Sequence, residues 1–250
     1  MVRRLGYILL ILACSVQLFG AQENSDNLIY GIPSSPDLLL NRRGFAIGYS
    51  HLYRQPLWVC YILTDNQLNI PKIRRSNKFR PDPDIAVNPV KPAEYRRSGY
   101  DRGHLAPAAD MSYAELPMRQ SFYMSNISPQ IPGFNRGIWK RLELQIRKWA
   151  QLERKLYIIT GPLFLDPQNI RKMKSIPVPD AFFKLILDLT PPRKMAAFII
   201  PNHTTKKRLK GFSVTVDMVE ALTGFDFFSG LPDEARMESR NQIDLWLIGK

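Results

Sequence analysis

The chain has 250 residues, of which 45% are hydrophobic and 23% are charged. This composition excludes an intrinsically disordered chain and is ample for one or two folded domains. Lysine and arginine outnumber aspartate and glutamate by 35 to 22, which favours a polyanionic partner such as nucleic acid or an anionic membrane surface, although a basic soluble protein without such a partner fits the charge equally well.

The N-terminus is predicted to be a targeting segment. Arg3 and Arg4 precede an apolar run over residues 5–21, and polar residues follow, which is the order of a secretory signal peptide. The run is short for a secure membrane span. We therefore expect residues 1–21 to be a signal peptide and the protein to be secreted or periplasmic. Two alternatives stay open, an uncleaved membrane anchor through residues 5–21 and lipid attachment at Cys14.

The basic character belongs to the rest of the chain. Without residues 1–21 there are 33 basic and 22 acidic residues, a net charge of +11. Cys60 is then the remaining cysteine, so no intrachain disulfide is available. Cys60 lies in the apolar run LWVCYIL, and we expect it to be a buried thiol rather than a nucleophile.

Residues 22–44 are polar and contain proline, and we expect them to lead into a single domain over residues 45–250. The stretch 44–63 predicts two strands joined by a turn around Tyr53–Pro56. Residues 69–97 hold five prolines and many cations, which excludes a regular helix and predicts a long surface loop. Loops of this length are often functional.

The next predicted elements flank an unusual motif, SGYDRGHLAPAADM at residues 98–111, which is typical of neither a helix interior nor an alternating strand. Residues 121–130 predict a short strand that ends at Pro129. A helix is then predicted from about residue 135 to about residue 153. Its apolar residues recur with the helical period at Ile138, Leu142, Ile146 and Trp149.

The C-terminal part predicts several strands in succession, over residues 156–164, 182–189 and 195–201. Residues 212–228 indicate a strand, a short helix and a further strand, and the tail from residue 231 is expected to be partly helical. Strands follow one another too often for a regular β–α–β series. We therefore expect a mixed α+β fold in one domain.

Several polar residues occupy positions that a core would not choose, and together they suit attack on a phosphodiester. They are His104, Asn126, Asn135, Glu143, Arg75 and Arg102. An imidazole deprotonates water near neutral pH. Arginine binds phosphate oxygens through two hydrogen bonds, and a hard divalent ion stabilises the departing oxygen.

The metal that fits this set is Mg²⁺, with Mn²⁺ as an alternative, because Mg²⁺ prefers oxygen ligands and keeps several waters. Zinc fits poorly, since His51 and His203 lie far from His104 in the sequence and there is no cysteine pair. On one regular helix Asn135 and Glu143 would be separated by about 12 Å of rise. Asn135 is therefore the expected direct ligand, and Glu143 is expected to hold a water of the ion or a neighbouring arginine.

Each of these residues also has a purely structural interpretation. His104 could be a capping or salt-bridged histidine in a turn, and Asn135 a helix N-cap. Glu143 could pair with Arg147 on a solvated helix face, and Arg75 could be one of many surface cations. Taken singly, none of these signals is specific.

Taken together, the motifs resemble one family. DRGHLAP, then NISPQ, then FNRGIWKRLE are similar to the motifs of the DNA/RNA non-specific endonucleases, which include secreted bacterial sugar-non-specific nucleases and mitochondrial endonuclease G. The spacing is 22 residues from His104 to Asn126, nine more to Asn135 and eight more to Glu143. The likeness covers roughly residues 45–230. It implies a largely antiparallel sheet flanked by helices, with a ββα-metal (His-Me) finger as the active site.

The resemblance also implies a role for each matching residue. His104 is the expected general base, Asn135 the sole direct protein ligand of the metal, normally Mg²⁺, and Glu143 an outer carboxylate that binds the waters of the metal. Arg102 is expected to contact the phosphate, and Asn126 to support the histidine and the metal environment.

Two further positions match the family near this motif. Arg75 best matches its upstream arginine, with the adjacent Arg74 as the alternative. Asp101 matches its structural aspartate.

The implied activity is metal-dependent hydrolysis of phosphodiester bonds in DNA and RNA with little sequence preference. A DNA-only nuclease and a catalytically silent nucleic-acid-binding homologue stay open as alternatives. An inhibitor protein would leave no mark in the sequence, and a monomer and a homodimer are both compatible with it.

Overall fold

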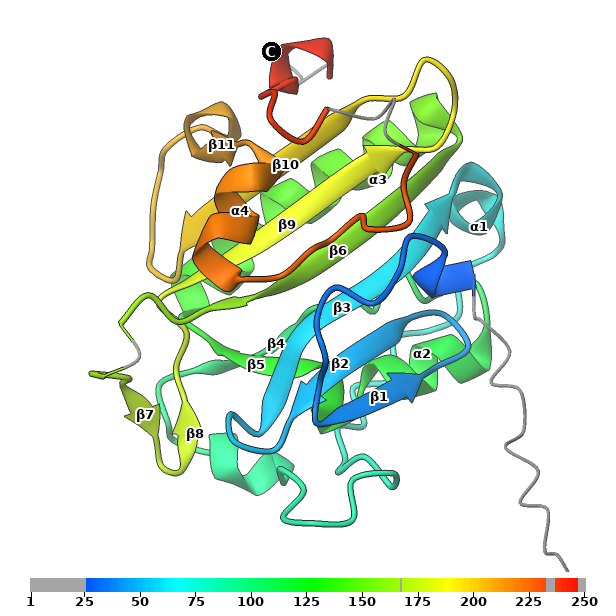
Figure 1. The fold of residues 1–250 in the computed structure, drawn as a ribbon. Helices are drawn as coiled ribbons and strands as arrows, with labels where there is room; N and C mark the ends of the chain where they lie inside the picture. The colour runs from blue at the N-terminus through cyan, green and yellow to red at the C-terminus, as the bar shows by residue number, and fades with distance from the viewer. Residues whose placement is uncertain (1–25, 167, 233–236, 247–250) are drawn as a thin grey trace, which may run out of the picture.

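The computed structural model describes residues 26–166, 168–232 and 237–246. A seven-stranded sheet runs through the molecule in the order β1-β2-β3-β6-β9-β10-β11 (Figure 1), and every neighbouring pair is antiparallel. Its strands are β1 Leu38–Asn41, β2 Ala46–Ser50, β3 Gln55–Thr64, β6 Lys155–Leu163, β9 Ala181–Asp188, β10 Met195–Pro201 and β11 Ser213–Val214. The predicted α+β fold with a largely antiparallel central sheet is confirmed.

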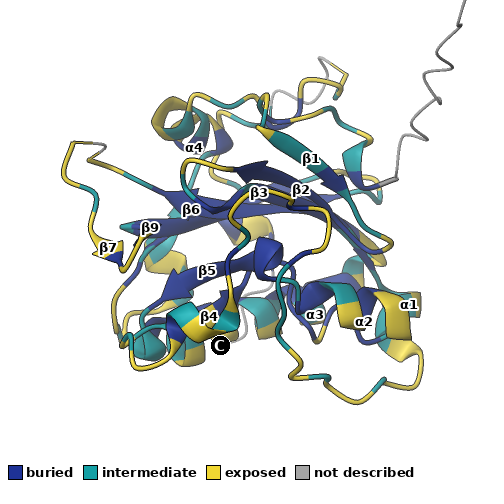
Figure 2. Ribbon diagram, turned by 90° about the horizontal axis from the view of Figure 1, so that it is seen from below, coloured by how far each residue is buried: buried dark blue, intermediate teal, exposed yellow. Residues whose placement is uncertain are grey.

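Helices cover both faces of this sheet (Figure 2). One face carries α1 Asp65–Asn69, α2 Glu115–Ser121, α3 Lys140–Glu153 and a separate antiparallel pair of strands, β4 Asp101–His104 and β5 Ile127–Gln130. The other face carries α4 Val216–Thr223, and a hairpin of β7 Lys172–Met173 and β8 Ile176–Pro177 extends beyond the sheet.

The alternation of side chains along the strands gives each face its own hydrophobic core. On β9, Phe182 and Ile186 pack on the side of α3, whereas Phe183 and Leu185 pack on the side of α4. The apolar residues that predict a helix around residue 142 are all buried, at Ile138, Leu142, Ile146 and Trp149. Their helical period therefore does place one face of α3 on the sheet.

Most of the expected strands are present, and the exceptions have local causes. β1 pairs with β2, so part of the expected lead-in over residues 22–44 belongs to the sheet. The strand expected over residues 121–130 is limited to β5, because α2 and a short 3₁₀ turn occupy the residues before it. After α4, residues 225–228 form no strand and instead pack phenylalanine side chains against the sheet.

The predicted helix from residue 135 to residue 153 is not regular. Residues Phe134–Trp139 form a π-helical turn, and α3 proper begins at Lys140. Gly137 interrupts the turn with φ −101° and ψ −108°, values outside the helical region. The rise of about 12 Å expected between Asn135 and Glu143 assumed a regular helix and does not apply to this kinked segment.

Residues 65–154 form one insertion between the neighbouring strands β3 and β6. The insertion is closed at its base, where Thr64 pairs with Lys155 in the sheet. The backbone N–H of Asp65 donates to the carbonyl of Arg154 at 2.9 Å, and the two side chains form an ion pair at 2.8 Å. Every predicted site residue lies within this insertion.

Within the described residues, no helix is long and apolar enough to cross a membrane. The expected signal peptide or anchor over residues 1–21, with Cys14, lies outside those residues. Cys60 is fully buried in β3, and burial raises the pKa of its thiol to about 12. The expectation of a buried thiol is confirmed.

Candidate active site

Five of the six predicted site residues line a single cleft of about 420 Å³ on the α3 side of the sheet. They are Arg75, Arg102, His104, Asn135 and Glu143. The cleft lies where β4, the π-helical turn and the start of α3 meet the loop over residues 69–97. Arg74 does not line it, so the geometry favours Arg75 for the position of the upstream arginine.

The pairing of β4 with β5 fixes the backbone on either side of His104. His104 lies opposite Ile127, and Gly103 lies opposite Ser128. A side chain at Gly103 would place its Cβ 2.1 Å from the side chain of Gln130, which would have to move to accommodate it. The glycine lets the two strands pack closely and sets the direction in which His104 leaves β4.

Asn126 is buried below the cleft and does not line it. Its Oδ1 accepts from the N–H of Ala106 at 2.9 Å, and its Nδ2 donates to the carbonyls of Ala106 at 2.9 Å and Ser121 at 3.0 Å. The backbone carbonyl of Asn126 also accepts from Leu105 at 3.0 Å. Asn126 therefore extends the strand pairing past His104 and fixes the segment that follows it.

His104 is held by aromatic packing. Its ring centroid lies 5.3 Å from Phe79 and 4.9 Å from Phe122, and its Nε2 is buried with no hydrogen-bond partner among the described residues. Burial, together with the charges of Arg75 and Arg102, lowers its pKa from 6.5 to about 3. The imidazole is thus neutral across the physiological range and carries an unprotonated ring nitrogen. A salt-bridged or capping role is not what the structure shows.

Phe79, from the loop over residues 69–97, and Phe122 each carry one arginine of the cleft. The guanidinium of Arg102 lies 4.3 Å from the centroid of the Phe79 ring, and the Phe79 ring packs on Phe122 at 4.9 Å. The guanidinium of Arg75 lies 5.1 Å from the Phe122 ring, and its Nε donates to Asn77 at 2.8 Å. These cation–π contacts hold the two cations beside His104.

Asn135 is oriented from β4 rather than acting as a helix cap. Its Nδ2 donates to Oδ2 of Asp101 at 2.9 Å, and Arg136 donates to both oxygens of Asp101 at 2.8 and 2.6 Å. Burial opposes ionisation of Asp101, but the hydrogen bonds from Arg136 and Asn135 outweigh it and lower the pKa of this carboxyl. Asp101 therefore fixes Nδ2 of Asn135 and determines the direction of its carbonyl oxygen.

Glu143 lies in the first turn of α3 and does not pair with Arg147. Instead, Arg147 binds Oδ1 of Asp110 at 2.7 Å, and the hydroxyl of Tyr61 donates to Oδ2 of Asp110 at 3.0 Å. Burial raises the pKa of Glu143 to about 7, which Asp110 reinforces and the charges of Lys184 and Arg147 oppose. Glu143 is thus a half-buried carboxyl in a strongly charged setting.

Lys184 does not line the cleft but interacts electrostatically with Glu143, which the sequence did not predict. It is fully buried on β9, with its Nζ 4.7 Å from the centroid of the Trp139 ring and no hydrogen-bond partner among the described residues. Burial lowers its pKa to about 8, and the charge of Glu143 opposes that shift. The sequence signal was a lysine inside the apolar run FFKLIL. Asp110, Phe79 and Lys140 were also missed, because nothing local marks them as neighbours of His104.

The oxygen donors of the cleft suit a hard divalent cation. The amide oxygen of Asn135 and the carboxylate of Glu143 line it, whereas His104 is its only histidine and no cysteine lines it among the described residues. Such a donor set favours magnesium or manganese over zinc. His51 and His203 lie outside the cleft.

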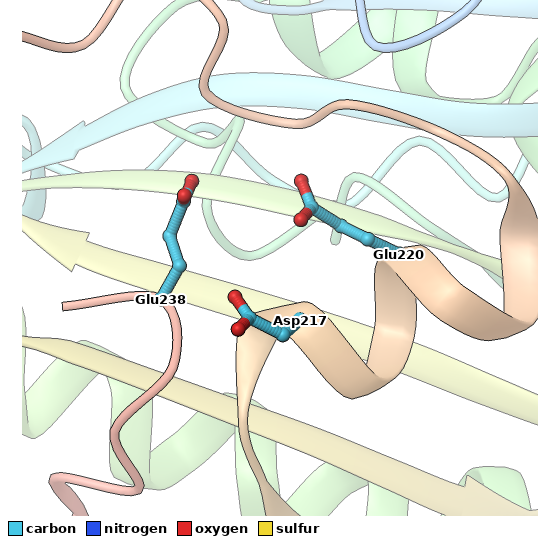
Figure 3. A group of neighbouring side chains, drawn as sticks. All are labelled: Asp217, Glu220 and Glu238. Carbon is cyan, nitrogen blue, oxygen red and sulfur yellow. The ribbon is translucent and has the colours of Figure 1, made fainter. Parts of the chain in front are cut away.

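A second group of carboxylates lies on the opposite face of the sheet. Figure 3 shows Asp217 and Glu220 of α4 facing Glu238, and their ligand oxygens lie within 4.8 Å of one another. Burial and the neighbouring carboxylates raise the pKa of Glu238 to about 7. One oxygen of Glu220 already accepts from the N–H of Phe227 at 2.9 Å. The sheet separates this acidic group from His104, so it is not part of the cleft.

A groove of about 660 Å³ next to the cleft is lined by residues of the loop over residues 69–97 and of α2, including the acidic Glu115. Arg75 lines both hollows. The further cations of the groove are Arg74, Lys78, Arg80 and Arg119. A group of cations beside the cleft is suited to the phosphates of a polynucleotide.

Several proteins with a similar sequence or structure are named as nucleases. A mitochondrial nuclease from Saccharomyces cerevisiae is 32% identical over 88% of this chain and 74% of its own length. Human mitochondrial endonuclease G is 33% identical over 79% of this chain and 71% of its own length. A chain from the crystal structure of the EndoG/EndoGI complex has a TM-score of 0.76 and 28% identity, and the match covers 82% of this chain and 91% of that one.

These relatives correct the expected location. The nucleases from S. cerevisiae and human are named as mitochondrial proteins, and the comparison gives no support for a secreted or periplasmic protein. The expected secreted or periplasmic location, with the alternative of a membrane-anchored protein, is therefore wrong. Arginines followed by a short apolar run do not by themselves specify a compartment.

The family model for DNA/RNA non-specific endonucleases matches residues 23–234. This match spans β1 through α4 and includes the whole insertion that carries the cleft. The motif order, the geometry of the cleft and the relatives agree. The chain belongs to the DNA/RNA non-specific endonuclease family.

Proposed function

We propose that this chain is a metal-dependent endonuclease that hydrolyses DNA and RNA with little sequence preference at the cleft around His104. The observation that carries the proposal is the convergence of His104, Arg102, Arg75, Asn135 and Glu143, spread over almost 70 residues of chain, on one cleft. Their chemistry supplies a base, phosphate-binding cations and metal-binding oxygens.

In this proposal His104 is the general base. Its ring is neutral at physiological pH, and it takes a proton from the attacking water. Arg102 and Arg75 bind the phosphate oxygens and stabilise the additional negative charge as the bond to phosphorus forms. Asn126 acts as a positioning residue, because its three side-chain hydrogen bonds hold the backbone directly after His104.

Asn135, through its amide oxygen, and Glu143, through water, would hold a divalent cation, which we propose to be Mg²⁺ with Mn²⁺ as a substitute. When bound, such an ion neutralises charge on the phosphate and on the departing oxygen. Asp101 assists by fixing the amide of Asn135. The donor set of the cleft supports this choice of ion.

The proposed partners are DNA and RNA. The cations that line the two hollows suit the phosphates common to every sequence. A similar chain has been solved as an EndoG/EndoGI complex described in terms of inhibition. We therefore include a protein inhibitor of this kind among the proposed partners.

Removal of the metal tests the proposed chemistry. Plasmid DNA and a structured RNA are incubated in parallel with Mg²⁺, with excess EDTA, and with EDTA followed by excess Mg²⁺ or Mn²⁺. Cleavage of both substrates should stop with EDTA and return with either ion. Cleavage that persists in EDTA contradicts the metal, cleavage of DNA alone supports a DNA-only nuclease, and no cleavage with any divalent ion supports a silent homologue.

The cationic groove predicts how binding depends on salt. Replacing Lys78 or Arg119 with alanine should weaken binding to every sequence alike and reduce the slope of log affinity against log salt by about 1. Fluorescence anisotropy of a labelled single strand over a range of KCl concentrations measures this slope. Arg193, an exposed cation in the turn between β9 and β10, is the matched control, and Arg193→Ala should keep the original slope. Equal slopes for all variants would remove the groove from the binding surface.

A further inference from the structure

A second cavity, of about 480 Å³, opens beside the catalytic cleft. The two hollows are adjacent, since Arg75, Ala108, Ala109 and Arg147 line both. This side cavity lies among α1, α2 and α3, which sit together on one side of the sheet (Figure 2). Its size falls within the range of about 300–1,000 Å³ that is typical of small-ligand sites.

The floor of the side cavity is apolar. It is formed by Leu68, Ile73, Ala108, Met118 and Leu144. Leu144 is 45% exposed on α3, on the opposite side from the residues that α3 buries against the sheet. An exposed leucine costs little by itself, but here it joins four apolar neighbours in a concave surface.

The rim of the side cavity is cationic. Lys72, Arg75, Arg147 and Lys148 line it, and no carboxylate from the described part of the chain does. Ser112 adds little polarity, because its hydroxyl already donates to the carbonyl of Ala109 at 2.7 Å. An apolar floor below a cationic rim matches a flat apolar group that carries phosphates on either side.

A nucleotide of the substrate strand has this chemistry. Its base offers two apolar faces and its flanking phosphates suit the cations of the rim. Because the cavity shares Arg75 and Arg147 with the catalytic cleft, a nucleotide bound here would be connected directly to the phosphodiester beside His104.

We propose that the side cavity binds one unstacked nucleotide of the strand being cut, adjacent to the phosphodiester at His104. This inference rests on the proposed nuclease function and adds a subsite to it. Leu144 and its apolar neighbours contact the face of the base and do not read its edge. The subsite therefore accepts all four bases and rejects a residue that has none.

An abasic residue tests the subsite. A labelled single-stranded 20-mer carries one tetrahydrofuran abasic residue near its centre, and partial digests are resolved at single-nucleotide resolution. Cleavage by the wild-type protein should drop by about tenfold at the one bond that places the abasic residue in the side cavity, because burial of the base is lost there. Bonds further away serve as the internal standard.

Two matched leucines on α3 provide the variants. Leu144→Gln replaces an exposed leucine of the cavity floor with a polar residue of similar size, and Leu152→Gln makes the same change at a leucine that is 58% exposed and outside the cavity. Leu144→Gln should cut the bond next to the abasic residue as often as the other bonds of the 20-mer, because the cavity no longer favours a base. Leu152→Gln should keep the wild-type profile.

The outcomes separate the subsite from the nuclease itself. If the wild-type protein cuts the bonds around the abasic residue as often as all others, or if Leu144→Gln gives the wild-type profile, the cavity does not bind a substrate nucleotide. If the 20-mer is not cut anywhere in the presence of Mg²⁺ or Mn²⁺, the proposed nuclease function fails, and the subsite with it.

Discussion

Replacing His104 with alanine is expected to lower the rate of DNA and RNA cleavage by about 10²–10⁴-fold, the usual contribution of a general base. The imidazole is neutral at physiological pH, since burial with Arg75 and Arg102 lowers its pKa to about 3. Binding of a labelled strand, measured by anisotropy in EDTA, should change little, because Arg102 and Arg75 remain. The loss should therefore appear in kcat rather than in affinity.

The packing around His104 provides a sharper test of its role. The ring lies between Phe79 and Phe122, so His104→Ala leaves a space lined by two aromatic rings. Free imidazole added to His104→Ala should restore part of the activity, while it should not restore His104→Leu, which fills the space. His203→Ala, at an exposed histidine outside the cleft, is the control and should be fully active. Full activity of His104→Ala would overturn the assignment of the base.

The second large effect is expected in the Mg²⁺ concentration that cleavage requires, which should depend on pH. Burial raises the pKa of Glu143 to about 7, so below that pH the carboxyl is increasingly protonated. Metal binding requires the ionised form, which makes protons and the metal compete. The Mg²⁺ concentration for half-maximal cleavage should be constant above about pH 7. Below it, that concentration should rise by up to about tenfold for each pH unit.

His104 does not set this acid limit, because its pKa lies far lower. Saturating Mg²⁺ should therefore shift the acid limb of cleavage to lower pH. Glu143→Gln cannot titrate, and its half-saturating Mg²⁺ concentration should be raised by about 10–100-fold and independent of pH. If the pH at which cleavage falls on the acid side is the same at every Mg²⁺ concentration, this role of Glu143 is contradicted.

Replacing the buried Lys184 tests the same role of Glu143 by shifting its pKa rather than removing its carboxyl. The positive charge of Lys184 opposes the rise in the pKa of Glu143, so Lys184→Met should raise that pKa further. The pH dependence of Mg²⁺ use should then move to higher pH. Lys194→Met is the matched control, because Lys194 also lies over a tryptophan, Trp246, at 4.9 Å, but away from the cleft. No shift is expected for it.

The sequence was informative where one short segment contained its own signal. The apolar period of α3 and the alternation of the long strands placed these elements correctly, since each depends on residues a few positions apart. The DRGH, NISPQ and FNRGIWKRLE motifs are local signals as well, and four of their five predicted site residues line one cleft together with Arg75.

The sequence did not predict features that depend on contacts between residues far apart in the chain. Glu143 and Arg147 are spaced as a helical ion pair, but Asp110, from a loop, takes the arginine instead. The kink at Gly137 depends on how the turn before α3 meets β4, where Asp101 binds Asn135 and Arg136. Lys184 interacts with Glu143 from a strand outside the insertion, and no local pattern connects the two residues.

The closure of residues 65–154 between β3 and β6 has an evolutionary consequence. Thr64 and Lys155 are neighbours in the sheet, so the strands on both sides keep their register whatever the chain does between them. Selection can therefore lengthen or shorten the loops of this segment without shifting β3 against β6, provided that α3 keeps its apolar face on the sheet. In an engineered form, the segment is a natural unit for transfer between relatives, with its two boundaries at Asp65 and Arg154.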